Sequence, residues 1–547
     1  MKRLRLMAMV LTVAMVVTLM TGCAGASKKE QVKTATTDAK IPEYLNMTGM
    51  PIAKQPITLK VFGSGSANQV DWNTMKVLTQ YEKMTNMSVK YDIIEAHAYP
   101  EKKNILFASR DLPDFFLRAK FTSADQVNFG TQGILAPLNE LIDQYAPNLK
   151  ALLAKYPDVK KDITAPDGKI YSLPVIRPTP AEKYGVKLYI NKTWLDKLSI
   201  KVPTTTEEYY QALKAFKEKD PNGNGKADEL GWTGDSSVKI IQFLHGAWGL
   251  NNAGSTASDI GSITVDKDPA APGKLRLICT APYYKEVLEY CNKLYKEGLI
   301  DNEVFTVKSA SVQNPAKAKD GVLGSFIATA DLDSITDNGG DNFVIIPALK
   351  GPHGEQMYTN VNTVGYAGVF AISANSKYPE AIMRWVDYLY GEEGSKLIQM
   401  GIEGETCKTM PDGKVVYTDL VKKNPQGLDV GTVMGGYTPM NAGQMPTLTS
   451  EKFQDLTPEF QDALKQLDKY AVKEVIPFFL HEPKAQDSIN TLEPEIINYY
   501  KEMRAKFVTG KEPLTKWDEY VSTIKKMGSD ELVKYYSDAY EKWKNSK

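Results

Sequence analysis

The chain has 547 residues, of which 66 are basic and 66 acidic, with four cysteines and an aromatic share of 10%. A hydrophobic share of 42% and a charged share of 24% are typical of globular proteins and exclude a disordered chain. The zero net charge gives no electrostatic attraction for nucleic acid, and four cysteines are too few for a disulfide scaffold. A chain of this length predicts two or more domains.

The N-terminus has the pattern of an export signal. A basic segment at residues 2–5 precedes an uncharged, mostly apolar run over residues 7–20, which is too short to cross a bilayer comfortably. The run ends with Met20 and two small residues before Cys23, which resembles a bacterial lipobox, although that pattern prefers Leu where Met20 stands. The resemblance implies that residues 1–22 are a signal peptide and that Cys23 carries diacylglycerol. The alternative is an ordinary secreted protein in which Cys23 is incidental.

Residues 23–55 are expected to be a lipid-anchored tether. They are rich in Lys, Ala, Thr and Pro and lack a sustained apolar period. No later segment has the apolar length needed to span a membrane, so the lipid would be the only membrane attachment.

The body that follows reads as an α/β chain. Alternating, β-rich segments predict strands over residues 57–62, 89–94 and 114–117, and helical patterns predict helices over 73–85 and 99–109. This order predicts a mostly parallel sheet with helices on its faces. Ligands of such sheets bind beyond the carboxyl ends of the strands, where Asp71, Trp72 and Arg118 stand.

Later segments are mostly helical. Helices are expected over residues 207–219 and 380–399 and from 458 to the end, whereas residues 420–448 are rich in Gly, Asn and Pro and predict a long surface loop.

A loop after the helix at 207–219 has the spacing of a calcium site. Oxygen-bearing side chains occupy loop positions 1, 3, 5 and 9, with glycine at position 6, as in an EF-hand loop. The candidate ligands are Asp220, Asn222, Asn224, the carbonyl of Lys226, Asp228 and, in place of the usual Glu at position 12, Glu229 at position 10. The alternative is an Asn- and Gly-rich turn that caps a helix.

The motifs of common catalytic sites are absent. The sequence has no G-x-S-x-G, H-E-x-x-H or P-loop pattern. Glu403 and Glu405, two residues apart, would share one side of an extended backbone and could serve acid–base chemistry on a glycoside. They could equally accept hydrogen bonds from a ligand or lie in a solvated loop. A disulfide between Cys279 and Cys291 also stays open.

Several segments together resemble a family 1 extracellular solute-binding protein of an ABC sugar importer, close to the large lipoprotein branch that includes alginate-oligosaccharide-binding proteins. The matching segments are residues 188–192, 203–208, 343–347, 350–354, 378–381, 385–389, 392–394, 401–405, 507–511 and 517–520. The resemblance implies the two-lobe, type II periplasmic-binding-protein fold, with a hinge near residues 172–174 and 343–347, an interlobe cleft and a structural Ca²⁺ in the loop described above. It places one lobe at residues 56–172 and 344–400, and the other at 173–343 and 401–547.

A sugar presents apolar C–H faces ringed by hydroxyls, so its site needs aromatic platforms and polar partners. The candidate platforms are Trp72, Trp248 and Tyr366, which stand in loop-like contexts, and packing between lobes is the alternative use of each. The candidate polar partners are Asp71, Arg118, Arg177 and Glu403. Either arginine could pair with a carboxylate if the sugar is a uronate.

The resulting hypothesis is a membrane-anchored lipoprotein on the extracellular face that captures an oligosaccharide and delivers it to the permease of an ABC importer. We expect a monomer that is not an enzyme and does not bind nucleic acid. The alternatives are a surface glycosidase or lyase, and a receptor for a solute that is not a sugar.

Overall fold

The computed structural model describes residues 41–184, 187–234, 237–250, 265–269, 271, 273–305, 317, 320–328, 343–358, 360–439, 444–454 and 456–546. The predicted signal peptide, Cys23 and most of the predicted tether lie outside these residues. The chain divides into two units, Met1–Glu43 and Tyr44–Lys547, and the second holds every element described below. Among the described residues, no helix combines the length and the apolar character that crossing a membrane requires.

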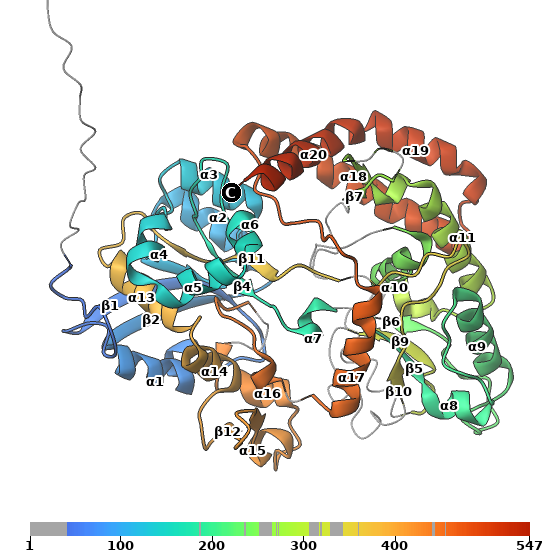
Figure 1. The fold of residues 1–547 in the computed structure, drawn as a ribbon, viewed down its shortest axis with the longest axis horizontal. Coiled ribbons are helices and arrows are strands. Elements are labelled where there is room, and N and C mark those ends of the chain that lie inside the picture. The colour runs from blue at the N-terminus through green and yellow to red at the C-terminus, as the bar shows by residue number, and fades with distance from the viewer. Residues whose placement is uncertain are drawn as a thin grey trace, which may run out of the picture. The chain divides into compact units, whose positions relative to one another are not determined.

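The first sheet has five strands in the order β2-β1-β3-β11-β4 (Figure 1). Its strands are β1 (Ile57–Gly65), β2 (Met87–Glu95), β3 (Phe115–Leu117), β4 (Leu173–Ile176) and β11 (Val364–Ile372). β1 pairs in parallel with β2 and β3, whereas β11 runs antiparallel between β3 and β4. The three predicted strands of the parallel part are therefore confirmed.

Helices cover both faces of the first sheet, which is why its strands alternate between two cores. Val61 and Phe115 belong to one buried cluster, and their neighbours Phe62 and Phe116 belong to another on the opposite face. The helices are α1 (Lys76–Thr85), α2 (Tyr99–Ser109), α3 (Ser123–Thr131), α4 (Asn139–Tyr145), α5 (Pro147–Lys155), α6 (Pro157–Asp162), α13 (Pro379–Tyr388) and α14 (Glu392–Met400).

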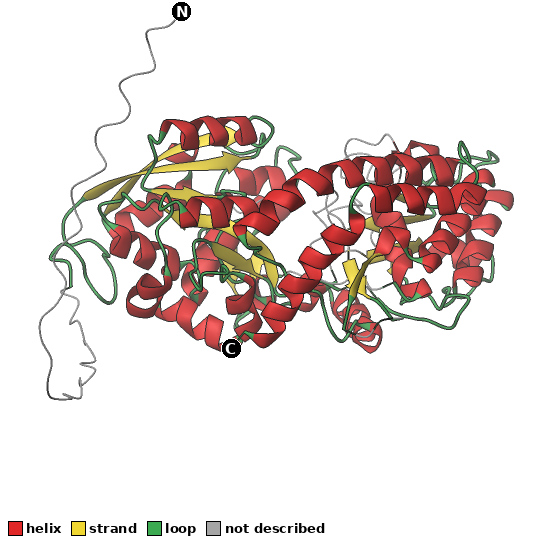
Figure 2. Ribbon diagram, turned by 90° about the horizontal axis from the view of Figure 1, so that it is seen from above, coloured by secondary structure: helices red, strands yellow, loops and turns green. Residues whose placement is uncertain are grey.

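The second sheet has four strands in the order β10-β5-β9-β6. They are β5 (Lys187–Asn191), β6 (Thr233–Gly234), β9 (Ser325–Ala328) and β10 (Phe343–Ile345). The helices of this part are α8 (Lys192–Lys197), α9 (Thr206–Glu218), α10 (Ser237–His245), α11 (Pro282–Lys296), α17 (Pro458–Leu467), α18 (Pro483–Thr509), α19 (Trp517–Lys526) and α20 (Ser529–Asn545). Figure 2 shows the strands in two groups, each flanked by helices.

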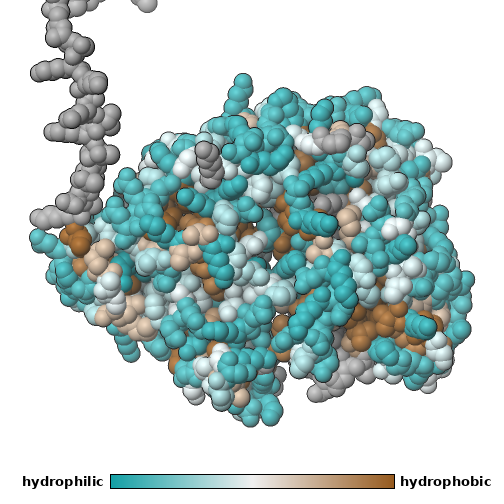
Figure 3. Space-filling model, in the orientation of Figure 1, coloured by the Kyte–Doolittle hydropathy of each residue, from teal (hydrophilic) through white to brown (hydrophobic). Residues whose placement is uncertain are grey.

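Smaller elements complete the chain. They are the strand pairs β7 (Val265–Lys267) with β8 (Leu275–Leu277) and β12 (Cys407–Thr409) with β13 (Val415–Tyr417), and the short helices α7 (Pro180–Lys183), α15 (Asp419–Lys422) and α16 (Val430–Gly435). On the face shown in Figure 3, hydrophobic residues gather in patches, one of them in the middle, within a largely hydrophilic surface. Cys279 and Cys291 are both buried and unbridged.

The long surface loop predicted for residues 420–448 is wrong in part, because α15 and α16 lie there. Val421, Val433 and Met434 are buried and form a small apolar cluster that holds the two helices together. Three apolar side chains scattered among Gly and Asn carry no helical period that a sequence reading would detect.

The body also begins earlier than residue 56, the predicted start of the first lobe. Leu45, Ile52 and Ala53 are fully buried against the core of the first sheet. The N–H of Ala53 donates to the carbonyl of Thr85 at 3.1 Å, and a guanidinium N–H of Arg384 donates to the carbonyl of Asn46. Apolar burial and backbone pairing therefore fix residues 44–55 on the body.

The predicted lobe boundaries shift as well. β4 belongs to the first sheet, so the first change of sheet comes after Ile176 and not at the predicted hinge, residues 172–174. Residues 401–453, assigned to the second lobe, contact the first: the Thr447 hydroxyl donates to the Leu389 carbonyl (2.8 Å), and Phe453 packs on Met400.

Within the described residues, the chain crosses between the surroundings of the two sheets at three places before α17, and Phe478, after α17, packs against the core of the first sheet again. The chain passes from the first to the second between β4 and β5, returns between β10 and β11, and passes again between Phe453 and α17, whose Phe460 packs with Phe326 of the second sheet. Because the connections between them are few, the two packed parts can move relative to each other about a hinge.

Candidate functional site

The loop after β1 and the end of β3 meet at a buried arginine. Arg118 donates from Nη1 to Gln69 Oε1 (3.1 Å) and to the carbonyl of Pro439 (3.3 Å), and from Nη2 to Ser66 Oγ (3.3 Å). The indole N–H of Trp72 donates to the same Gln69 oxygen at 3.3 Å, and the guanidinium lies 5.9 Å from the Trp72 ring. Trp72 and Arg118 therefore lie together, as their positions at the strand ends predicted.

Both side chains are inside the protein. Trp72 is 2% exposed and Arg118 is 1% exposed, so neither offers a face to a ligand here. Burial lowers the pKa of Arg118 to about 10, and no carboxylate in the described part of the chain forms an ion pair with it. Arg118 (φ +49°) and Lys120 (φ +48°) both adopt the left-handed region, which is strained for long side chains. Arg118 therefore holds three segments in place.

Asp71 begins the short 3-10 helix Trp72–Thr74 and serves it as a cap. Its Oδ1 accepts from the Asn73 backbone N–H (2.9 Å) and side-chain amide (2.8 Å), which lowers the pKa of this exposed carboxyl. The capping role uses only Oδ1 of the Asp71 carboxylate.

Arg177 and Tyr366 lie side by side at the same edge of the sheet. The Arg177 guanidinium is 5.1 Å from the Tyr366 ring, and its Nη1 is 3.2 Å from Glu182 Oε2. Both side chains are only partly exposed. A Cβ at Gly365 would come within 2.5 Å of the Arg177 side chain, so the glycine permits this contact.

Trp248 is not an exposed platform, contrary to the prediction. It is 3% exposed, packs in the core of the second sheet, and donates its indole N–H to Glu286 Oε2 at 3.2 Å. Trp248 follows α10, and the sequence around it, Gly-Ala-Trp-Gly, reads as a turn although the turn is buried.

Glu403 and Glu405 do not form a pair suited to acid–base catalysis. Glu403 accepts from the Thr409 N–H (2.7 Å) and hydroxyl (2.8 Å), whereas Glu405 accepts from Tyr437 Oη (2.8 Å) and Lys76. These bonds lower the pKa of both carboxyls, so both are ionised near neutral pH. A glycosidase needs one carboxyl with a raised pKa as its acid.

The predicted calcium loop is a tight turn built around one carboxylate. Asp220 Oδ1 accepts from the N–H groups of Gly223 (3.0 Å) and Asn224 (3.1 Å), and Oδ2 accepts from Gly225 (3.0 Å). Asp220, Gly223 and Gly225 all have positive φ, which the two glycines adopt without strain.

Asp228, the second acid of the loop, is bonded to amides of the loop itself. Asp228 accepts from the side-chain amides of Asn222 (2.9 Å) and Asn224 (3.0 Å), which lowers its pKa, and Lys226 donates its N–H to Asn224 Oδ1 at 2.8 Å. Among the described residues, no three His, Cys, Asp or Glu side chains converge to hold a metal ion. The loop would therefore need its amide and backbone oxygens as further ligands.

Glu229 is the residue that fits a bound cation. It is 6% exposed, burial raises its pKa, and neither carboxylate oxygen has a hydrogen-bond partner among the described residues. A buried carboxylate without a partner is costly, and a hard cation would satisfy it.

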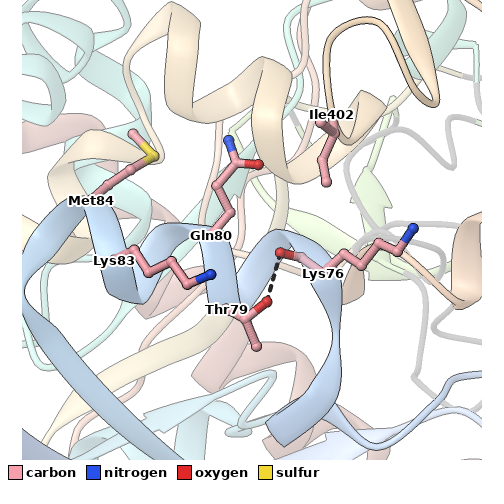
Figure 4. A pocket seen from close by; sticks show the side chains of 6 residues that line it. All are labelled: Lys76, Thr79, Gln80, Lys83, Met84 and Ile402. Atoms are coloured by element: carbon pink, nitrogen blue, oxygen red, sulfur yellow. Dashed lines mark hydrogen bonds between the residues drawn. The ribbon is translucent and has the colours of Figure 1, made fainter.

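A small pocket of about 440 Å³ lies on α1, lined by Lys76, Thr79, Gln80, Lys83, Met84 and Ile402 (Figure 4). It has no aromatic residue, and Lys76 is paired with Glu405. A pocket without an aromatic platform is poorly suited to a sugar.

Sequence reasoning missed the residues that organise the strand ends. Gln69 stands in the predicted loop after β1 and could have been considered on that ground. Pro439, 321 residues from Arg118, leaves no sequence signal.

The profile of the family described as bacterial extracellular solute-binding protein matches residues 67–396. The chain is 27% identical over 537 residues to the fructooligosaccharide ABC transporter substrate-binding protein FusA of Streptococcus pneumoniae serotype 4, covering 93% of this chain and 95% of FusA. It is 26% identical over 486 residues to Lipoprotein LipO of Bacillus subtilis, covering 85% of this chain and 88% of LipO.

Solved structures agree with the fold. FusA in complex with kestose superposes with a TM-score of 0.74 at 25% identity, covering 90% of this chain and 100% of FusA. A FusA EF-hand mutant with fructo-nystose, and the alginate-binding protein AlgQ2 without calcium ion, both give 0.74 at 24% identity, each with coverage of 90% of this chain and 100% of the other.

Proposed function

Because the chain belongs to the family of bacterial extracellular solute-binding proteins, we propose that it captures an oligosaccharide between its two sheets and delivers it to an ABC importer. The observation that carries the proposal is the similarity to FusA over nearly the whole length of both chains. The few connections between the sheets suit a receptor that closes on its ligand, because closure couples occupancy to recognition by a permease.

A binding role is favoured over catalysis. The relatives are substrate-binding proteins, and the Glu403 and Glu405 carboxyls are both held ionised by separate partners. Arg177 and Tyr366 are the predicted contact residues that keep partial exposure at the strand ends, and we assign them to the ligand.

The protein acts as a monomer held at the extracellular face of the membrane by a lipid on Cys23. The lipobox-like sequence and the similarity to LipO support this anchor. Two or more acyl chains would give a stable attachment, where one would be marginal.

A structural Ca²⁺ is bound by the loop at residues 220–229. The unpartnered, buried carboxylate of Glu229 supports it, and relatives have been studied as an EF-hand mutant and without calcium ion. The ligands would be Asp220, Asn222, Asn224, the Lys226 carbonyl, Asp228 and Glu229. The ion would offset two of the three negative charges of the loop and stiffen the end of α9.

Isothermal titration of the mature protein with kestose, alginate oligosaccharides and galacturonan oligosaccharides tests the function. We expect saturable binding of at least one saccharide, with the saccharide recovered unchanged by chromatography. Shortened saccharides after incubation would support the enzyme alternative instead, and no binding across the panel would refute an oligosaccharide receptor.

A further inference from the structure

The last helix of the chain is bonded to the first part of the fold. α20 packs in the core of the second sheet through Leu532 and Tyr540, and Trp543, in its last turn, packs partly against the same core. The indole N–H of Trp543 donates to Asp162 Oδ1 at 2.8 Å. Asp162 ends α6, whose Val159 lies in the core of the first sheet. One hydrogen bond thus joins helices that belong to opposite cores, and α6 lies near the C-terminus in Figure 1.

Asp162 is also bonded to one of the connections between the sheets. Asn362, between β10 and β11, donates from its side-chain amide to Asp162 Oδ2 at 3.2 Å. Both oxygens of this carboxylate, in a residue that is 3% exposed, therefore have a partner. Lys161 Nζ lies 5.1 Å from the centre of the Trp543 ring and adds a cation–π contact. The carboxylate links α6, α20 and the connection that returns to the first sheet.

A cavity of about 1360 Å³ lies beside this bond. One wall comes from α4, α5, α6 and the turn that leads to β4, and the other from residues 478–485 and α20. Lys161 and Trp543 are among the lining residues. The two walls are therefore not packed against each other throughout, and a hinge motion can widen or narrow the space between them.

The segment before α18 holds the same side of the fold by apolar packing. Phe479 lies in the core of the second sheet, whereas its neighbours Phe478 and Leu480 pack against the two clusters of the first sheet. The hydroxyl of Ser123, at the start of α3, donates to the Phe479 carbonyl at 2.9 Å. Freeing these side chains would expose apolar surface to water, whereas opening the bond between Trp543 and Asp162 breaks one polar contact. The bond can therefore open while this segment stays attached to both parts.

We propose that the bond between Trp543 and Asp162 is a latch that holds the two parts of the fold at the angle of this structure, with residues 478–480 as the pivot. When the latch opens, α6 and α20 are free to move relative to each other. The strength of the bond then sets the share of molecules at this angle. Apparent affinity scales with the share of molecules in the binding-competent state, so the latch tunes affinity without contacting the ligand, whichever solute the protein binds.

Trp543→Phe in the mature protein tests the latch, because Phe keeps an aromatic ring on the core and removes the N–H. Dyes on Lys83→Cys in α1 and Gln211→Cys in α9, two exposed positions, report the distance between the parts by energy transfer. The native cysteines in the described chain are buried, so the dyes label the introduced ones. A lost hydrogen bond changes an equilibrium constant by roughly fivefold to tenfold. We expect the ratio of molecules at the wild-type distance to all others to fall by about that factor.

Tyr535→Phe is the matched control on the same helix. It removes hydrogen bonds that stay within the second part, to Ser488 Oγ at 3.2 Å and Glu531 Oε1 at 2.7 Å, and should leave the distance unchanged. Hydrogen exchange of the same proteins should be faster in α6 of Trp543→Phe and unchanged in β1 and β5. A wild-type distance and wild-type exchange of α6 in Trp543→Phe would overturn the latch. Exchange that rises in β1 and β5 as much as in α6 would overturn it too, because Trp543 would then support the whole fold.

Discussion

Replacing Glu229 by Gln should have opposite effects on stability with and without calcium. In the absence of the ion, the wild type buries a carboxylate whose two oxygens have no partner. A buried, unsatisfied polar group costs about 1–3 kcal/mol, and a charge costs more. The amide of Gln is still an unsatisfied polar group, so Glu229→Gln removes only the excess cost of the charge and should stabilise the calcium-free protein by on the order of 1 kcal/mol. The amide has nearly the same shape, so packing is preserved.

With calcium the order should reverse. At a calcium concentration of about 100 times Kd, the ion stabilises the wild type by roughly 2.7 kcal/mol, and the variant should lose most of that gain because it lacks the carboxylate ligand. Thermal melts with saturating calcium and with a chelator measure both effects. Glu218→Gln, at the exposed C-terminal end of α9, is the control and should change neither melt. A variant less stable than the wild type by the same amount in both solutions would refute the reasoning.

Three further outcomes are expected. Trp248→Ala should destabilise the protein by about 3–5 kcal/mol in urea, because it empties a buried core position, and leave saccharide affinity unchanged. Burial raises the pKa of Asp387 from 3.8 to about 6, so its contribution to the free energy of unfolding is complete below pH 3.8 and is lost as the pH rises through 6. Asp387→Asn should abolish this loss, which is about 2 kcal/mol between urea melts at pH 4 and pH 7. Cys23→Ser should move the protein from the membrane fraction to the soluble fraction of cells.

Regular patterns in the sequence predicted the first strands and helices well. In β1, Ile57, Leu59 and Val61 alternate with exposed Thr58 and Lys60, and the period of two is visible without any tertiary information. The helix expected over residues 99–109 is α2, with Pro near its start and a left-handed residue at its end.

The strand β11, which lies between β3 and β4, was not predicted, for a physical reason. Gly365 and Gly368 read as turn residues, yet they lie within a nine-residue strand. A Cβ at Gly368 would come within 2.3 Å of the Phe121 carbonyl oxygen, so the glycine serves a close approach between segments far apart in sequence. Local patterns carry no information on such contacts.

The candidate site, like the fold, could be predicted from the sequence only in part. Residue type and strand ends were enough to place Trp72 with Arg118, whereas Arg177 and Tyr366 were named only as separate candidates, because the strands that bring them together were not predicted. Residue type and strand ends did not distinguish the buried pair from the partly exposed pair, because burial depends on Pro439 and other partners remote in the chain.

The place of β11 in the sheet has a consequence for export. When a chain crosses the membrane from its N-terminus, β1, β2, β3 and β4 emerge first. The position between β3 and β4 in the sheet stays unoccupied until β11, which ends at residue 372, has emerged. The second sheet needs only residues up to 345. The second sheet can therefore be completed before the first, although most of its strands come later in the sequence. Until β11 is added, the unpaired edges of β3 and β4 must be kept from pairing with other chains.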